Sequence, residues 1–124
     1  EHHRFTYCNA GHDNPFWLRG QKSMQRLGTG GLVLGIAESF PYEEEMIPMD
    51  HGDTIVIYSD GITESINAQE EFYGEERLTS VLERHGRDSA QNLMQRIIDA
   101  AKGHAGSHPQ SDDMTVVVVK RLGI

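Results

Sequence analysis

Two short runs of apolar, mostly β-branched residues constrain the fold of this 124-residue chain most strongly. Residues 54–58 (Thr-Ile-Val-Ile-Tyr) and residues 114–119 (Met-Thr-Val-Val-Val-Val) are each preceded by polar, turn-forming sequence. Runs of this length and composition are typical of strands that are buried on both faces of a sheet. They are far too short to span a bilayer, so the sequence predicts no membrane segment in this chain.

Most of the sequence between these two runs has helical periodicity. Residues 75–85 place Leu78 and Leu82 on one face, and we expect Gly86 just after the C-terminus of this helix. A second amphipathic helix follows, with Asp88 or Ser89 as its N-cap, and a polar loop is expected at residues 103–111. A short helix is also expected at residues 62–67.

The N-terminal half has strand signals. Residues 4–9 alternate between polar and apolar, residues 11–15 are turn formers, and residues 16–19 resume a strand, which together predict a β-hairpin. Residues 43–49 predict a further strand. The single cysteine, Cys8, is expected to be a small buried hydrophobe, and a chain without a disulfide fits a reducing compartment.

The order of the elements indicates an α+β fold. Several strands, two helices and one final strand do not fit regular βαβ alternation, whereas a mostly antiparallel sheet flanked by helices does. We find no linker or repeat, so residues 1–124 are expected to lie in a single domain. The net charge of −8 argues against a nucleic-acid partner, because phosphate binding requires a basic surface.

Aspartates flank the two apolar runs. Asp60 follows the first run, and Asp112 and Asp113 precede the second. If the two strands are antiparallel neighbours, Asp60 and Asp112 meet at one edge of the sheet, where a hard divalent cation relieves the repulsion of their charges. The alternative stays open, since Asp-Gly is a common turn and Asp-Asp is often a solvated loop. The histidines, including His12, show no zinc-helix spacing and are expected to be ordinary surface residues.

Five sequence blocks carry a resemblance to a known family. Their most specific parts are Asn9-Ala10-Gly11-His12, Ser59-Asp60-Gly61 and Ser111-Asp112-Asp113, with a glycine-rich segment at 31–36 and a Phe-Tyr-Gly segment at 72–74. In this order the blocks resemble the PP2C-like (PPM superfamily) serine/threonine phosphatases of the SpoIIE/RsbU-like branch. The blocks cover nearly the whole chain.

The resemblance implies a PP2C-like αββα sandwich with two Mg²⁺ or Mn²⁺ ions at one edge. It implies that Asp60 and Asp112 are metal ligands, that Asp113 and Gly61 support them, and that no catalytic residue beyond the metal ligands is needed. The implied reaction is hydrolysis of phosphoserine or phosphothreonine on a regulatory protein in bacterial signal transduction. The implied substrate is an anti-anti-sigma-like regulator of a sigma factor, in the cytoplasm.

The resemblance also has a gap. The family domain has further strands and helices upstream, with the residue that bridges the two metals, so residues 1–124 are expected to be the C-terminal part of one domain that is incomplete at its N-terminal side. Metal occupancy and activity of such a fragment are open, and a catalytically incomplete or non-catalytic protein-binding module is the alternative. Open sheet edges would favour a homo-oligomer.

Overall fold

The computed structural model describes residues 3–20 and 23–123. Its elements, in chain order, are β1 (Arg4–Tyr7), β2 (Phe16–Arg19), β3 (Ser23–Arg26), β4 (Glu45–Pro48), β5 (Thr54–Tyr58), α1 (Asp60–Thr63), α2 (Gly74–His85), α3 (Ala90–Ala105) and β6 (Val116–Lys120). The predicted fold class, mostly antiparallel strands flanked by helices, is confirmed.

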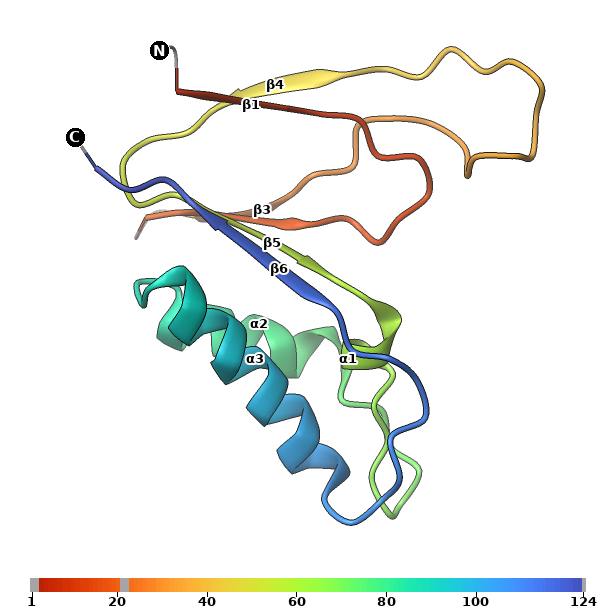
Figure 1. The fold of residues 1–124 in the computed structure, drawn as a ribbon, viewed down its shortest axis with the longest axis vertical. Helices are drawn as coiled ribbons and strands as arrows, with labels where there is room; N and C mark the ends of the chain where they lie inside the picture. Colours follow the sequence, from red (N-terminus) through yellow and green to blue (C-terminus); the bar gives the residue numbers. More distant parts are fainter. Residues whose placement is uncertain (1–2, 21–22, 124) are drawn as a thin grey trace.

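The molecule has three layers (Figure 1). The middle layer is a four-stranded antiparallel sheet in the order β3-β2-β5-β6. Helices α2 and α3 cover one face, and the antiparallel pair β1-β4 lies over the other. Among the described residues, no helix is long and apolar enough to cross a membrane.

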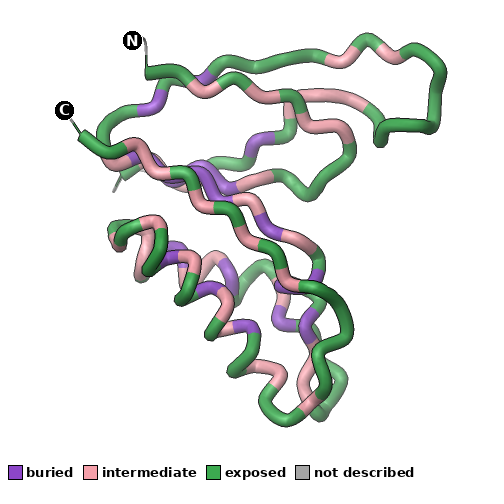
Figure 2. Tube along the Cα trace, in the orientation of Figure 1, coloured by how far each residue is buried: buried purple, intermediate pink, exposed green. Residues whose placement is uncertain are grey.

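Two clusters of buried side chains hold the layers together, and the buried residues in Figure 2 follow the sheet and the inner faces of the helices. Between the helices and the sheet, Val56 and Tyr58 of β5 pack with the apolar faces of α2 and α3. On the other face of the sheet, Trp17 and Ile55 pack with Ile47 of β4. The alternation of β5 thus divides its side chains between two cores, which explains why nearly all of this strand is apolar.

The predicted N-terminal hairpin is wrong. β1 pairs with β4, whereas β2 pairs with β3 and β5, so residues 8–15 cross from one layer to the other. The physical reason is that Phe5 and Tyr7 pack against the same cluster as Trp17 but from the opposite side. The alternation of β1 turns its other residues outward, and Cys8, just beyond the strand, is exposed rather than buried.

The last strand is less buried than its composition predicts. β6 is an edge strand of the four-stranded sheet, and Val117 and Val119 are 46% and 38% exposed. Val116 and Val118 pack toward the helices. The valine run therefore has one covered face and one that is partly open.

The helix ends follow local chemistry. Ser89, one of the two N-caps that the sequence allowed, accepts a hydrogen bond from the Asn92 amide (3.1 Å) at the start of α3. Gly86 does follow α2, but its φ of −60° shows that it is not a left-handed cap. A side chain there would lie 2.7 Å from the Leu82 carbonyl, so glycine is needed for space. The short helix α1 begins at Asp60, two residues before the predicted start.

Candidate metal centre

The pairing of β5 with β6 brings the two predicted aspartate positions together. The strands are antiparallel, with Tyr58 opposite Val116, so the end of β5 lies beside the start of β6. Asp60 and Asp112 line one cavity of about 350 Å³ at this edge of the sheet. The other residues that line it are Gly11, His12, Asp13, Ser59, Asp113 and Thr115.

Ser59 fastens the two strand ends to each other. Its hydroxyl oxygen accepts a hydrogen bond from the Thr115 amide (2.9 Å), and the hydroxyl donates to the Asp113 carbonyl (3.2 Å). Its backbone amide donates to the Thr115 carbonyl (3.0 Å). These bonds continue the β5–β6 ladder by one residue beyond the strands and fix the chain on both sides of Asp60.

Gly61 allows the closest approach of the two segments. A Cβ atom at this position would lie 1.9 Å from the Asp113 carbonyl oxygen, which is far inside van der Waals contact. Gly61 is buried while Asp60 is exposed, so the turn of α1 presents the Asp60 carboxylate outward and packs the glycine inward. Only glycine can occupy this place without moving the loop that carries Asp112 and Asp113.

The Asp112–Asp113 pair is ordered by its own backbone. One carboxylate oxygen of Asp112 accepts a hydrogen bond from the Asp113 amide (2.7 Å), and the Asp112 carbonyl accepts from Gln110 (2.8 Å). The Asp113 carbonyl accepts the hydrogen bond from Ser59 described above, and Asp113 lines the cavity. Asp112 thus keeps one carboxylate oxygen that is not used in this turn.

The crossing loop of residues 9–15 forms the third wall of the cavity and is folded around Asn9. The Asn9 side-chain oxygen accepts hydrogen bonds from the amides of Gly11 (3.2 Å) and His12 (2.8 Å), and its amide group donates to Asn14 (3.2 Å). Gly11 has a φ of +98°, a conformation that favours glycine. This turn places His12 and Asp13 at the cavity.

Asp13 brings a third segment's carboxyl group against Asp60. Contact with the Asp60 carboxyl is the largest effect that raises the pKa of Asp13, and desolvation adds to it, while the charge of His12 acts in the opposite direction. Two carboxyl groups held this close favour either a shared proton or a bound cation. The electrostatics at this edge of the sheet therefore suit a positively charged ligand.

The donor set suits a hard divalent cation. Aspartates 13, 60, 112 and 113 all line the cavity, and Mg²⁺ is often held by one or two carboxylates while it keeps several waters. Within residues 3–20 and 23–123, no three acidic, histidine or cysteine side chains are close enough to enclose a metal ion. The described residues thus offer a place for a largely hydrated cation and not a closed cage.

Sequence reasoning found the two strand-end aspartates but missed Ser59 and Asp13, and it treated His12 as an ordinary surface residue. A hydroxyl residue directly before Asp60 was the available signal for Ser59. No local signal points to Asp13, because its position depends on the crossing of residues 8–15 between the layers, where a hairpin had been predicted.

Comparisons with known proteins identify the family of this chain. The sequence profile of the family described as Stage II sporulation protein E (SpoIIE) matches residues 1–122. Phosphoserine phosphatase RsbU of Bacillus subtilis (strain 168) is 32% identical over 120 residues, which are 96% of this chain and 35% of RsbU.

Solved structures extend the likeness to the fold. The SiaA-PP2C domain of Pseudomonas aeruginosa is similar with a TM-score of 0.80 at 19% identity, over 96% of this chain and 47% of that one. The PP2C phosphatase domain of SpoIIE from Bacillus subtilis is similar with a TM-score of 0.74 at 22% identity, over 94% of this chain and 33% of that one. The chain therefore spans less than half the length of these relatives.

Proposed function

This chain belongs to the SpoIIE family of PP2C-like phosphatase domains, and from that premise we propose that it contributes the Asp60–Asp112 side of a metal-dependent protein serine/threonine phosphatase. The observation that carries the proposal is the single cavity lined by residues from the end of β5, the start of β6 and the crossing loop. Asp60 and Asp112 would hold a cation at this place, and Asp13 of the crossing loop lines the same cavity.

Each residue has a distinct part in the proposed site. Asp60 and Asp112 would hold Mn²⁺ or Mg²⁺ with their carboxylate oxygens, and Asp13 adds negative charge beside Asp60. Ser59 and Gly61 keep the two aspartate-bearing segments in contact, and Asp113 takes part through its carbonyl. The chemistry that the cation supplies when bound is a lower pKa for water and stabilisation of the charged phosphoryl oxygens.

The proposed substrate is a phosphoserine or phosphothreonine on a regulatory protein. RsbU is named a phosphoserine phosphatase, and by family likeness we propose an anti-anti-sigma-like regulator of a sigma factor as the partner, in a bacterial signalling pathway in the cytoplasm. No catalytic side chain beyond the proposed metal ligands Asp60 and Asp112 is proposed.

A non-catalytic or catalytically incomplete module is the second candidate. It is favoured by the absence of a three-ligand group from the described residues. Under this reading the cavity binds a cation weakly and the chain does not turn over substrate on its own.

A phosphatase assay separates the two candidates. Hydrolysis of a phosphoserine peptide is followed with Mn²⁺ titrated, on this chain and on the longer natural polypeptide where this chain is part of one. We expect Mn²⁺-dependent turnover that Asp60→Ala abolishes and that Asp99→Ala preserves, since Asp99 is an exposed aspartate of α3. Turnover in the longer polypeptide alone would identify this chain as a half-site, and no Mn²⁺-dependent turnover in either would contradict the proposal.

A further inference from the structure

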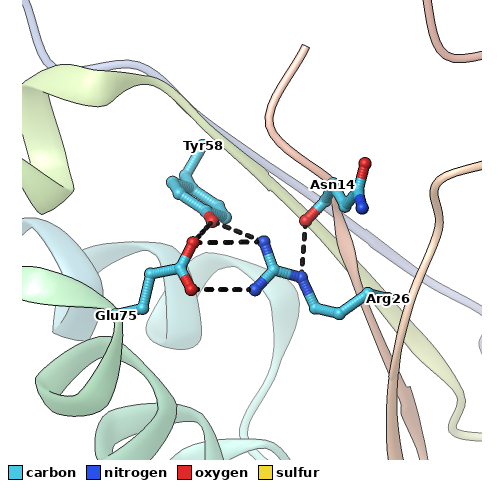
Figure 3. Close-up of polar contacts among 4 residues, drawn as sticks. All are labelled: Asn14, Arg26, Tyr58 and Glu75. Atoms are coloured by element: carbon cyan, nitrogen blue, oxygen red, sulfur yellow. Dashed lines mark hydrogen bonds and ion pairs between the residues drawn. The ribbon is translucent and has the colours of Figure 1, made fainter. Parts of the chain in front are cut away.

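An arginine outside the cavity joins three other parts of the molecule to β3. Arg26 is the last residue of β3, and its guanidinium donates through Nε to the Asn14 carbonyl (2.8 Å) and through Nη2 to the Tyr58 hydroxyl (2.7 Å). Both Nη atoms also face the Glu75 carboxylate, at 3.3 and 3.4 Å (Figure 3). One side chain therefore connects the crossing loop, β5 and the first turn of α2.

The orientation of this guanidinium is fixed from several sides. Its plane lies over the Phe16 ring, 4.0 Å from the ring centre, and the Tyr58 hydroxyl also donates to Glu75 (3.1 Å). Hydrogen bonding to Arg26 is the main effect that lowers the pKa of Glu75, so the Glu75 carboxylate is charged at neutral pH. A planar group with a two-pronged partner and a stacked ring has little rotational freedom. Its Nε–H is consequently held toward Asn14.

Asn14 directly follows Asp13, which lines the same cavity as Asp60. Two carboxylates that face one cavity repel each other when no cation lies between them, so a contact that anchors this end of the loop opposes their separation. Asn9, the first residue of the loop, gives the loop its shape and donates hydrogen bonds to the carbonyls of Leu27 and Thr29. The Arg26 bond acts at the other end of the loop, one residue from Asp13, and connects that end to Tyr58, two residues before Asp60.

We propose that Arg26 is a positioning residue that, through the Asn14 carbonyl, holds Asp13 beside Asp60 before any cation binds. The inference rests on the proposed function in one respect, namely that the cavity is the cation site. The role of Arg26 in holding the loop does not depend on that premise, because it concerns the metal-free chain.

The test compares variants of Arg26 with a matched arginine. Arg26→Met removes all four hydrogen bonds, and Arg26→Lys keeps the positive charge but loses the directed Nε–H. Arg19→Met is the control, since Arg19 stacks on Trp17 (4.5 Å) at the opposite end of β2. Amide hydrogen exchange of residues 11–14 is measured without metal, and Mn²⁺ affinity is measured by calorimetry.

We expect both Arg26 variants to speed exchange at the His12 amide several-fold beyond any change in global unfolding. We also expect them to raise the Mn²⁺ dissociation constant about tenfold, as for other groups that orient ligands. Arg19→Met should change neither quantity. If Arg26→Met does not fold, Glu75→Gln, which removes the ion pair and leaves Arg26 in place, should show the same changes to a smaller extent.

Two results would overturn the proposal. One is an Arg26→Met variant that lowers global stability but leaves loop exchange at the wild-type rate. The other is full restoration of loop exchange and Mn²⁺ affinity by Arg26→Lys, because charge alone would then account for the effect. The proposed function fails if neither this chain nor the longer polypeptide shows Mn²⁺-dependent turnover, whereas loop exchange in the metal-free chain still decides the role of Arg26.

Discussion

At the scale of single residues, the Asp13 carboxyl group is held against Asp60 at a cost that a cation would relieve. We predict that Asp13→Asn raises the stability of the metal-free chain by roughly 0.5 kcal/mol, the size of other exposed like-charge contacts. The same change should reduce the stabilisation that added Mn²⁺ gives. Thermal unfolding in EDTA and in Mn²⁺ measures both effects, and a variant that is less stable in EDTA would contradict the repulsion.

The ionisation of Tyr58 limits the stability of the chain at alkaline pH. Burial is the main cause that raises the pKa of its hydroxyl to about 12, and the side chain is 1% exposed. Below the ordinary tyrosine pKa of about 10 the group is neutral in both states. As the pH rises toward 12, the unfolded chain ionises first, and the free energy of unfolding falls by up to about 1.4 kcal/mol per pH unit.

We therefore predict that Tyr58→Phe lowers stability by about 1 kcal/mol at neutral pH, through its lost hydrogen bonds, and flattens the loss above pH 10. Urea unfolding at several pH values between 8 and about 11.5 measures this. The flattening should be partial, because the pKa values of Tyr7 and Tyr73 are also raised by burial. An unchanged alkaline slope would show that Tyr58 does not stay neutral in the fold.

The residues of the candidate site differ in how far sequence could predict them. Asp60 and Asp112 were accessible because each directly flanks an apolar run, and the antiparallel pairing of those runs then places both at one cavity. Asp13 and Arg26 were not, because their partners are set by pairings between distant segments. Cys8 shows the same limit. The alternating pattern of residues 4–9 does not reveal which side of the strand is buried until the layer that contains β1 is known.

At the scale of elements, the contact between α1 and the loop before β6 depends on one missing side chain. Because a Cβ at Gly61 would collide with the Asp113 carbonyl, we predict that Gly61→Ala destabilises the chain by roughly 1–3 kcal/mol. Gly103→Ala is the matched control. Gly103 lies in α3 with open space around it, so this substitution should raise the free energy of unfolding by about 0.5–1 kcal/mol. Urea unfolding of both variants measures the contrast, which a neutral Gly61→Ala would contradict.

Elements with strong apolar patterns were predictable, and weakly patterned ones were not. β5 and α2 match the expected ranges closely, because each has an apolar face that must be buried. α3 begins just after Ser89, one of its predicted N-caps, but it extends to Ala105, three residues into the polar loop that was expected at residues 103–111. β3, with the sequence Ser-Met-Gln-Arg, was missed, since it is an edge strand and mostly exposed, and it owes its place to pairing with β2. The burial of β6 was overestimated because composition does not reveal that a strand lies at an edge.

At the scale of the whole molecule, β6 leaves an edge of the main sheet open beside exposed valines. Such edges pair with other chains unless charge protects them. We predict that this chain associates with itself as its concentration rises and that Val119→Lys shifts it to the monomer. Val33→Lys is the control, because Val33 is a similarly exposed valine outside the sheet. Light scattering over a concentration series decides, and a monomer throughout would contradict the prediction.

The most direct test of the central claim is to locate Mn²⁺ on the chain by paramagnetic broadening of amide resonances, which detects even weak binding. We predict that small amounts of Mn²⁺ first broaden residues 11–13, 59–61 and 112–115, and that Asp60→Asn combined with Asp112→Asn removes this selectivity. The acidic run Glu43-Glu44-Glu45 is a built-in comparison site. Broadening centred on that run, or unchanged by the double substitution, would show that the cavity between β5, β6 and the crossing loop is not a metal site.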